Sequence, residues 1–266
     1  MSNSKQSNVG NFAAIVIPAT ILVAILIYMF VLGNPDNFND PETKHSPKSG
    51  NMMGMVYTGG LVVPVLISCF LMVWVFFVER LLTLSKAKGN GNVGQFVRKI
   101  KSLLSSRDIA TAMAECDKQK GSVANVIKAG LVKYQEMEKD NELDKEKKIL
   151  AIQKDIEEAT QLEMPMMERN LVVISTLASV ATLLGLLGTV LGMIRSFAAL
   201  AESGGGNAEA LALGISEALI NTALGIGTSA LAIIFYNFFT NKIDTLTHGI
   251  DEAGFSIVQT FAASKN

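Results

Sequence analysis

The residues best placed to do chemistry are one acid and a set of hydroxyl groups inside long apolar runs of the chain. Glu217 is the only charged side chain within the four longest apolar runs, and Asn221 follows it one helical turn later. An ionisable group at the centre of a bilayer costs at least about 2.5 kcal/mol, so it usually faces a cavity or a partner. Near the end of a span the cost is smaller, which leaves a structural role as the alternative interpretation of Glu217.

Small and hydroxylated residues recur at spacings of three and four in two of these runs, which places each set on one face of a helix. Two interpretations fit the pattern. Small residues let membrane helices pack closely, which the spacing alone favours, whereas hydroxyl groups could also line a polar pore. The polar members are Ser175, Thr182 and Thr189 in one run, and Thr222 and Ser229, with Asn221 beside them, in the other.

Four apolar runs must position these groups: residues 12–32, 58–78, 171–194 and 211–239. A helix rising about 1.5 Å per residue needs roughly 20 residues to cross about 30 Å of hydrocarbon, and each run is long enough. The sequence therefore predicts an all-α integral membrane protein with four transmembrane helices. The first run, at about 12–32 within an N-terminal region of residues 1–57, could instead be a signal peptide, but its length favours a retained anchor.

The polar stretch of residues 79–170 holds most of the Lys and Arg residues, which by the positive-inside rule places it in the cytoplasm. Its apolar residues keep helical spacing and predict a helical bundle, with a kink at Pro165 before the third span. The loop that follows the first span, up to residue 57, and the connection 195–210 are then exported. Both termini are cytoplasmic, and residues 240–266 form a short amphipathic tail.

Composition and motifs argue against several other classes of protein. The charge is nearly balanced, with 23 Lys and Arg against 24 Asp and Glu, so no nucleic-acid partner is expected. His45 and His248 lie far apart in sequence. Cys69 lies inside the second apolar run, whereas Cys116 lies in the polar stretch of residues 79–170. We therefore expect no metal site, no cofactor and no disulfide. Without a nucleophile elbow or a P-loop pattern, the chain is not expected to be an enzyme.

Two segments of the last two spans resemble the MotA/TolQ/ExbB family of proton-channel subunits. Residues 185–197 read GLLGTVLGMIRSF and residues 214–227 read GISEALINTALGIG, and both look like the second and third membrane helices of ExbB and TolQ. The resemblance covers roughly residue 58 to the C-terminus. Two features depart from it: Thr182 stands where many relatives have a proline, and the first span is additional to the usual three.

The resemblance implies a homo-oligomer, a ring of five chains in the bacterial inner membrane, whose last two spans surround two copies of a single-span subunit similar to ExbD or TolR. It places the family's pore threonines at Thr189 and Thr222 and its pore glutamate at Glu217. A proton pathway along these residues would add, as further candidates for the pore wall, Ser175, Thr182, Asn221 and Ser229.

The function that we expect is that of a stator subunit, which lets protons run down their gradient to energise an envelope protein similar to TonB or TolA. The four spans contain no Asp, and one Glu cannot carry a proton across about 30 Å of hydrocarbon, so a partner must supply a titratable group. A MotA-like flagellar or gliding stator and a non-conducting membrane scaffold are the alternatives.

Overall fold

The computed structural model describes residues 7–40, 42, 47–202 and 208–264, and in these ranges it is helical, with a single isolated β-bridge between Phe38 and Pro47. Four of its helical segments are long and apolar enough to cross a membrane. The prediction of an all-α membrane protein with four spans is confirmed. The windows lie in Phe12–Leu32, Val62–Ser105, Lys145–Ala201 and Leu211–Ala262.

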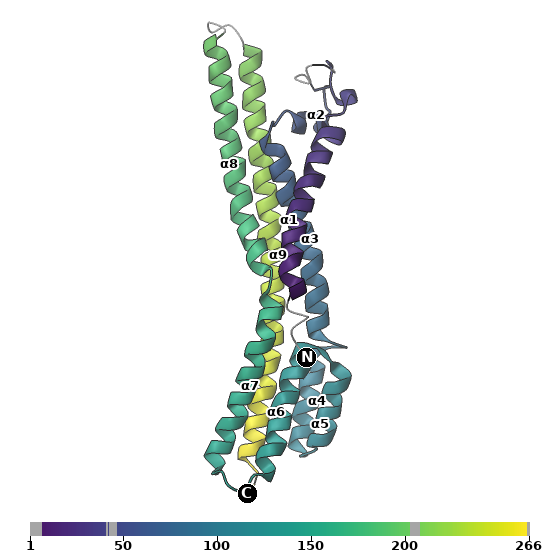
Figure 1. The fold of residues 1–266 in the computed structure, drawn as a ribbon, viewed down its shortest axis with the longest axis vertical. Coiled ribbons are helices and arrows are strands. Elements are labelled where there is room, and N and C mark those ends of the chain that lie inside the picture. The colour runs from purple at the N-terminus through teal and green to yellow at the C-terminus, as the bar shows by residue number, and fades with distance from the viewer. Residues whose placement is uncertain (1–6, 41, 43–46, 203–207, 265–266) are drawn as a thin grey trace. The chain divides into compact units, whose positions relative to one another are not determined.

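The chain divides into two compact units (Figure 1). The apolar unit comprises residues 1–78 and 173–236, and the polar unit comprises residues 79–172 and 237–266. The elements of the apolar unit are α1 (Ser7–Leu26), a π-helical continuation (Ile27–Leu32), a 3-10 turn (Pro35–Asn37), α2 (Met52–Tyr57), most of α3 (Val62–Lys88), most of α8 (Leu171–Glu202) and the first half of α9 (Ala208–Ala262).

Within the apolar unit, aromatic side chains join the helices. Trp74 and Phe77 of α3 both contact Phe235 of α9, with ring centroids 5.3 and 4.2 Å apart. Helix α1 touches α3 through Phe12 and Phe76, whose centroids are 6.0 Å apart. Only 11% of the apolar window of α1 is buried, against 33 to 44% in the other three spans. Helix α1 therefore exposes apolar side chains on most of its surface, as a lipid-facing helix does.

The polar unit contains four complete helices together with the second half of α9. Asn92 and Asp108 cap two of them, accepting hydrogen bonds from the backbone N–H groups three residues later. In the core, Gly130 leaves room for Ile156 and Ile257, and Tyr134 meets Phe261 edge to face. The four helices are α4 (Val93–Ser105), α5 (Ile109–Gln119), α6 (Gly121–Lys139) and α7 (Lys145–Glu168).

The helices differ from the predicted boundaries in three places. Helix α7 continues through Pro165 and ends at Glu168, and the chain turns at Asn170, which has a φ of 60°. Asn tolerates this left-handed conformation better than most residues, so the break falls there.

Helices α8 and α9 extend into the predicted 195–210 connection, of which residues 203–207 lie outside the described residues. Finally, α9 runs for 55 residues without a break into the predicted tail.

A buried arginine lies where α3 leaves its apolar run. The Arg80 side chain is only 1% exposed, and its guanidinium donates two hydrogen bonds, of 2.6 and 2.7 Å, to the Glu79 carboxylate. A third donor reaches the Met167 carbonyl at 3.2 Å. Burial alone would raise the pKa of Glu79, but hydrogen bonds from Arg80, Asn170 and Thr83 outweigh it, and the pKa lies below its ordinary value.

We predict that Glu79→Gln destabilises the protein by roughly 3 kcal/mol, because it leaves a buried guanidinium without its counter-charge. The control is Glu158→Gln, which breaks an exposed pair with Lys154 (N–O distance 3.7 Å) and should change nothing measurable. Denaturant unfolding of the purified chain in detergent measures both. Equal stability of the two variants would contradict this role of Arg80.

The same pair predicts a pH dependence. Because the pKa of Glu79 is lowered on folding, its stabilisation is fully present above the unfolded carboxyl pKa of about 4.3 and is lost as the pH falls through the lower folded value. Unfolding followed from pH 7 downward should show a loss of stability in acid that is smaller in Glu79→Gln.

Candidate functional site

Helices α8 and α9 form a close antiparallel pair, and glycines at their contact make it possible. A Cβ atom at Gly185 would lie 3.0 Å from the Asn221 carbonyl oxygen, and one at Gly188 would lie 2.4 Å from the Asn221 Cβ. At Gly192 it would lie 3.0 Å from the Ala218 nitrogen. Only residues without a side chain allow this approach. For the glycines of the α8 stripe, the packing interpretation therefore holds.

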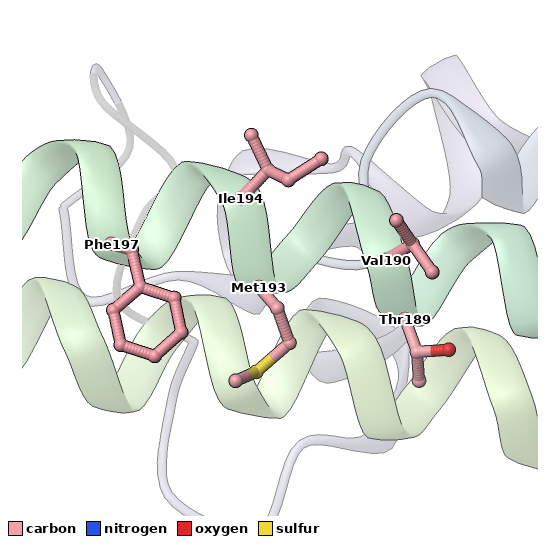
Figure 2. Close-up of a pocket in the computed structure, with 5 residues that line it drawn as sticks. All are labelled: Thr189, Val190, Met193, Ile194 and Phe197. Carbon is pink, nitrogen blue, oxygen red and sulfur yellow. The ribbon is translucent and has the colours of Figure 1, made fainter.

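The two candidate threonines lie one on each helix of this pair and in different surroundings. Thr222 is partly buried and donates a hydrogen bond of 3.2 Å across the pair to the Gly185 carbonyl. Thr189 donates to the Leu186 carbonyl of its own helix. Figure 2 shows that Thr189 belongs to a shallow groove whose residues all come from α8. The other residues of this groove are apolar: Val190, Met193, Ile194 and Phe197.

Glu217 forms an ion pair with Arg195 of α8. The carboxylate side chain is 13% exposed and the guanidinium side chain 49%, so the arginine is the more accessible partner. The sequence analysis missed this pairing. No local pattern recorded it, because the two residues lie on different helices and Gly214, not Glu217, lies against Ser196, the neighbour of Arg195.

Asn221 lies inside the apolar unit. Its side chain is fully buried, packs against Gly188 and donates a hydrogen bond of 2.8 Å to the Gly59 carbonyl. Its amide oxygen has no hydrogen-bond partner. This position is that of a residue that joins helices, so it does not favour the prediction that Asn221 lines a pore.

The other three candidates for the pore wall lie together. Ser175 and Thr182 of α8 and Ser229 of α9 line one groove of about 510 Å³ between the two helices. Ser229 is 7% exposed, and Thr182 donates to the Ala178 carbonyl of its own helix. The groove is completed by Ala178, Ser179, Leu183, Ile233 and Tyr236.

Along α9 alone, three candidate polar groups lie at three levels, those of Glu217, Thr222 and Ser229. From the helical rise, Glu217 lies about 7 Å along the axis from Thr222, and Thr222 about 10 Å from Ser229. A hydrogen bond spans only about 3 Å, so these groups cannot pass a proton to one another directly. Any proton that moves along the pair needs water, or a group from another chain, between the levels.

Within the residues that the structure describes, no three His, Cys, Asp or Glu side chains gather into a potential metal site. Both cysteines, Cys69 and Cys116, are free and buried.

Comparisons with known proteins agree on one family. A model described as the MotA/TolQ/ExbB proton channel family matches residues 118–252. An ExbB-like biopolymer transport protein of Synechocystis is 41% identical over 86 residues, which are 32% of this chain and 41% of that protein. The ExbB of Aquifex aeolicus is 41% identical over 83 residues, which are 31% of this chain and 55% of that protein. The TolQ of Haemophilus influenzae is 25% identical over 193 residues, 70% of this chain and 81% of that protein.

We predict that Arg195 and Glu217 stabilise the protein as a pair. Arg195→Gln or Glu217→Gln alone leaves one partly buried charge without its counterpart, whereas the double variant leaves none. In a double-mutant cycle the two losses should therefore be non-additive by about 0.5–3 kcal/mol, with the double variant no worse than the poorer single variant. Thermal unfolding in detergent measures this. Losses that simply add would show that the ion pair contributes no stability.

Proposed function

The chain belongs to the MotA/TolQ/ExbB proton channel family, and we propose that it is a stator subunit that conducts protons together with a single-span partner. As a multi-pass membrane protein it would lie in the bacterial inner membrane. The stretch 79–170 and both termini would be cytoplasmic, because that stretch carries most of the basic residues.

The observation that carries this proposal is the spacing of polar groups along α9. Glu217, Thr222 and Ser229 are separated by about 7 and 10 Å along this helix, and both gaps exceed the reach of a hydrogen bond. The spans supply Glu217 and no Asp. A partner similar to ExbD or TolR, with an acid inside its span, would supply the titratable group. A ring of five chains around two such helices would enclose it.

The two threonines suit such a pathway in different ways. Thr222 orients its hydroxyl across the helix pair, and Thr189 places a hydroxyl at the edge of an apolar groove on α8. That groove is suited to a membrane helix, since its other side chains are apolar. A hydroxyl can accept a hydrogen bond from water or from a partner carboxyl group while it donates to a carbonyl.

The ion pair gives Glu217 a second role. A lone guanidinium beside a proton pathway would repel protons, and the Glu217 carboxylate cancels that charge. The acid would therefore keep the potential near Arg195 neutral, in addition to any exchange of protons with water.

The energy available fits a mechanical stator. A membrane potential supplies about 2.3 kcal/mol per charge per 100 mV, so several protons per cycle would be needed to move an envelope protein similar to TonB or TolA. The ExbB relatives are named as biopolymer transport proteins and the TolQ relatives as Tol-Pal system proteins. Both names suit an envelope process better than a flagellar motor.

We predict that Thr189→Val and Thr222→Val each lower proton flux several-fold in liposomes that contain the chain with its co-purified single-span partner. Valine keeps the shape and removes the hydroxyl. Thr20→Val is the matched control, because Thr20, like Thr189, donates to carbonyls of its own helix but lies in α1. Wild-type flux in both variants, with the ring intact by native mass spectrometry, would favour the scaffold alternative.

Cysteine labelling tests the topology. Asn39 and Lys120 are both exposed, and we predict that Asn39→Cys reacts with an impermeant maleimide in spheroplasts whereas Lys120→Cys reacts only after lysis. The native cysteines should stay silent, because both are buried and because burial, with the Asp117 charge, raises the pKa of Cys116 to about 12. Labelling of Lys120→Cys before lysis would invert the proposed orientation.

A further inference from the structure

The backbone of Gly60, in the turn between α2 and α3, lies directly against the Arg195–Glu217 ion pair. Gly60 has a φ of +76°, and a Cβ atom there would lie 2.6 Å from Glu217 Oε1 and 3.0 Å from Arg195 Nη1. A side chain at this position would be strained by the positive φ, and the ends of Glu217 and Arg195 would have to move to admit it. The turn and the ion pair are therefore in contact through main-chain atoms.

The neighbouring residue fastens the same turn to α9. The Gly59 carbonyl accepts a hydrogen bond of 2.8 Å from Asn221, which is fully buried and lies one helical turn after Glu217. A buried amide that donates to a backbone carbonyl is costly to break, because both groups would lose their partner away from water. The turn is thus held beside Glu217 at two successive positions.

The other end of the turn is held from the N-terminal side. The Tyr28 hydroxyl donates a hydrogen bond of 3.2 Å to the Tyr57 carbonyl, and the two rings stack with centroids 4.6 Å apart. Phe38 meets Tyr57 edge to face at 5.3 Å. Tyr28 lies in the π-helical continuation of α1. The additional N-terminal helix therefore reaches the turn through one tyrosine pair.

The loop that follows Tyr28 is itself held in place by side-chain amides. Asn37 donates hydrogen bonds of 2.9 Å to the carbonyls of Val31 and Leu32, and it accepts one of 3.0 Å from Asn51. Asn37 is 8% exposed. This network joins the end of the first span to the start of α2, so Tyr57 has a fixed support.

From these contacts we infer that the N-terminal helix and the loop behind it are a positioning element for Glu217. Tyr28 holds the Tyr57–Gly60 turn, and the turn holds the carboxylate against Arg195. This inference rests on the proposed function, because Glu217 belongs to a proton pathway only if that function is right. Packing alone does not explain the first span, since only 11% of its apolar window is buried, while Tyr28, Val31 and Leu32 at its C-terminal end form hydrogen bonds with residues of the following loop and turn.

The first test is the reactivity of Glu217 with a membrane-permeant carbodiimide, followed by peptide mass spectrometry in the complete complex. An ion-paired carboxylate reacts slowly, and a displaced one in apolar surroundings protonates and reacts faster. Gly60→Ala should therefore raise labelling of Glu217 several-fold. Gly50→Ala is the matched control, because Gly50 has a similar φ of +78° but open space where its Cβ would lie. Equal labelling of the two variants would overturn the inference.

Two further variants separate positioning from general disruption. Tyr28→Phe keeps the ring stack and removes only the donor to Tyr57, so it should raise labelling of Glu217 less than Gly60→Ala does. Adding Glu217→Asp to Gly60→Ala shortens the acid by one methylene, which makes room for the new methyl group, and should give a higher proton flux than Gly60→Ala alone. No effect of Tyr28→Phe on labelling, or a double variant with less flux than Gly60→Ala, would contradict the positioning role.

Proton flux distinguishes failure of this inference from failure of the proposed function. If Gly60→Ala raises labelling of Glu217 while flux stays at the wild-type level, the turn positions the acid but the acid is not in the pathway. If Glu217→Ala abolishes flux while Gly60→Ala matches Gly50→Ala in both measurements, the pathway stands and the positioning element does not.

Discussion

The close approach of α8 and α9 is the constraint on which the candidate site depends. With Gly185, Gly188 and Gly192 against α9, the two backbones come near enough for a side chain of one helix to reach the main chain of the other. The hydrogen bond from Thr222 to the Gly185 carbonyl is one result. The ion pair between Arg195 and Glu217 is another. A larger residue at Gly188 would meet Asn221 and push the helices apart, and these polar contacts would separate with them.

The fully buried Asn221 connects this helix pair to the rest of the apolar unit. On one side it fills the space that Gly188 leaves, and on the other it bonds to the Gly59 carbonyl. A single side chain thus links the packing of α8 and α9 to the position of the Tyr57–Gly60 turn. Its amide oxygen, buried and without a partner, marks a place where a water molecule would gain a hydrogen bond.

Much of the fold could be predicted from the sequence because hydrophobicity and helical spacing report local environment. The four spans and the helices of the polar unit follow from these patterns. The end of α9 could not be placed, because the change from apolar to polar near residue 240 marks a change of surroundings and not the end of a helix. Since no proline or cap interrupts residues 240–262, the helix continues.

The site was only partly predictable. Glu217 stood out because it is alone in the spans, and Ser175, Thr182 and Ser229 because they share helix faces. Contacts between distant parts of the chain, such as Gly60 against Glu217, depend on how a loop folds back, and no local pattern records that.

The ion pair also constrains how the chain enters the membrane during synthesis. A helix that crossed the translocon alone with Arg195 or with Glu217 would carry a full charge toward the lipid, which is costly even near the end of a span, where the cost is below the value of about 2.5 kcal/mol at the bilayer centre. If α8 and α9 enter together as a helical hairpin, the two charges meet before either contacts hydrocarbon. The pairing of Arg195 with Glu217 therefore favours insertion of the last two spans as one unit, in which α8 waits for α9 to be synthesised before both enter the lipid.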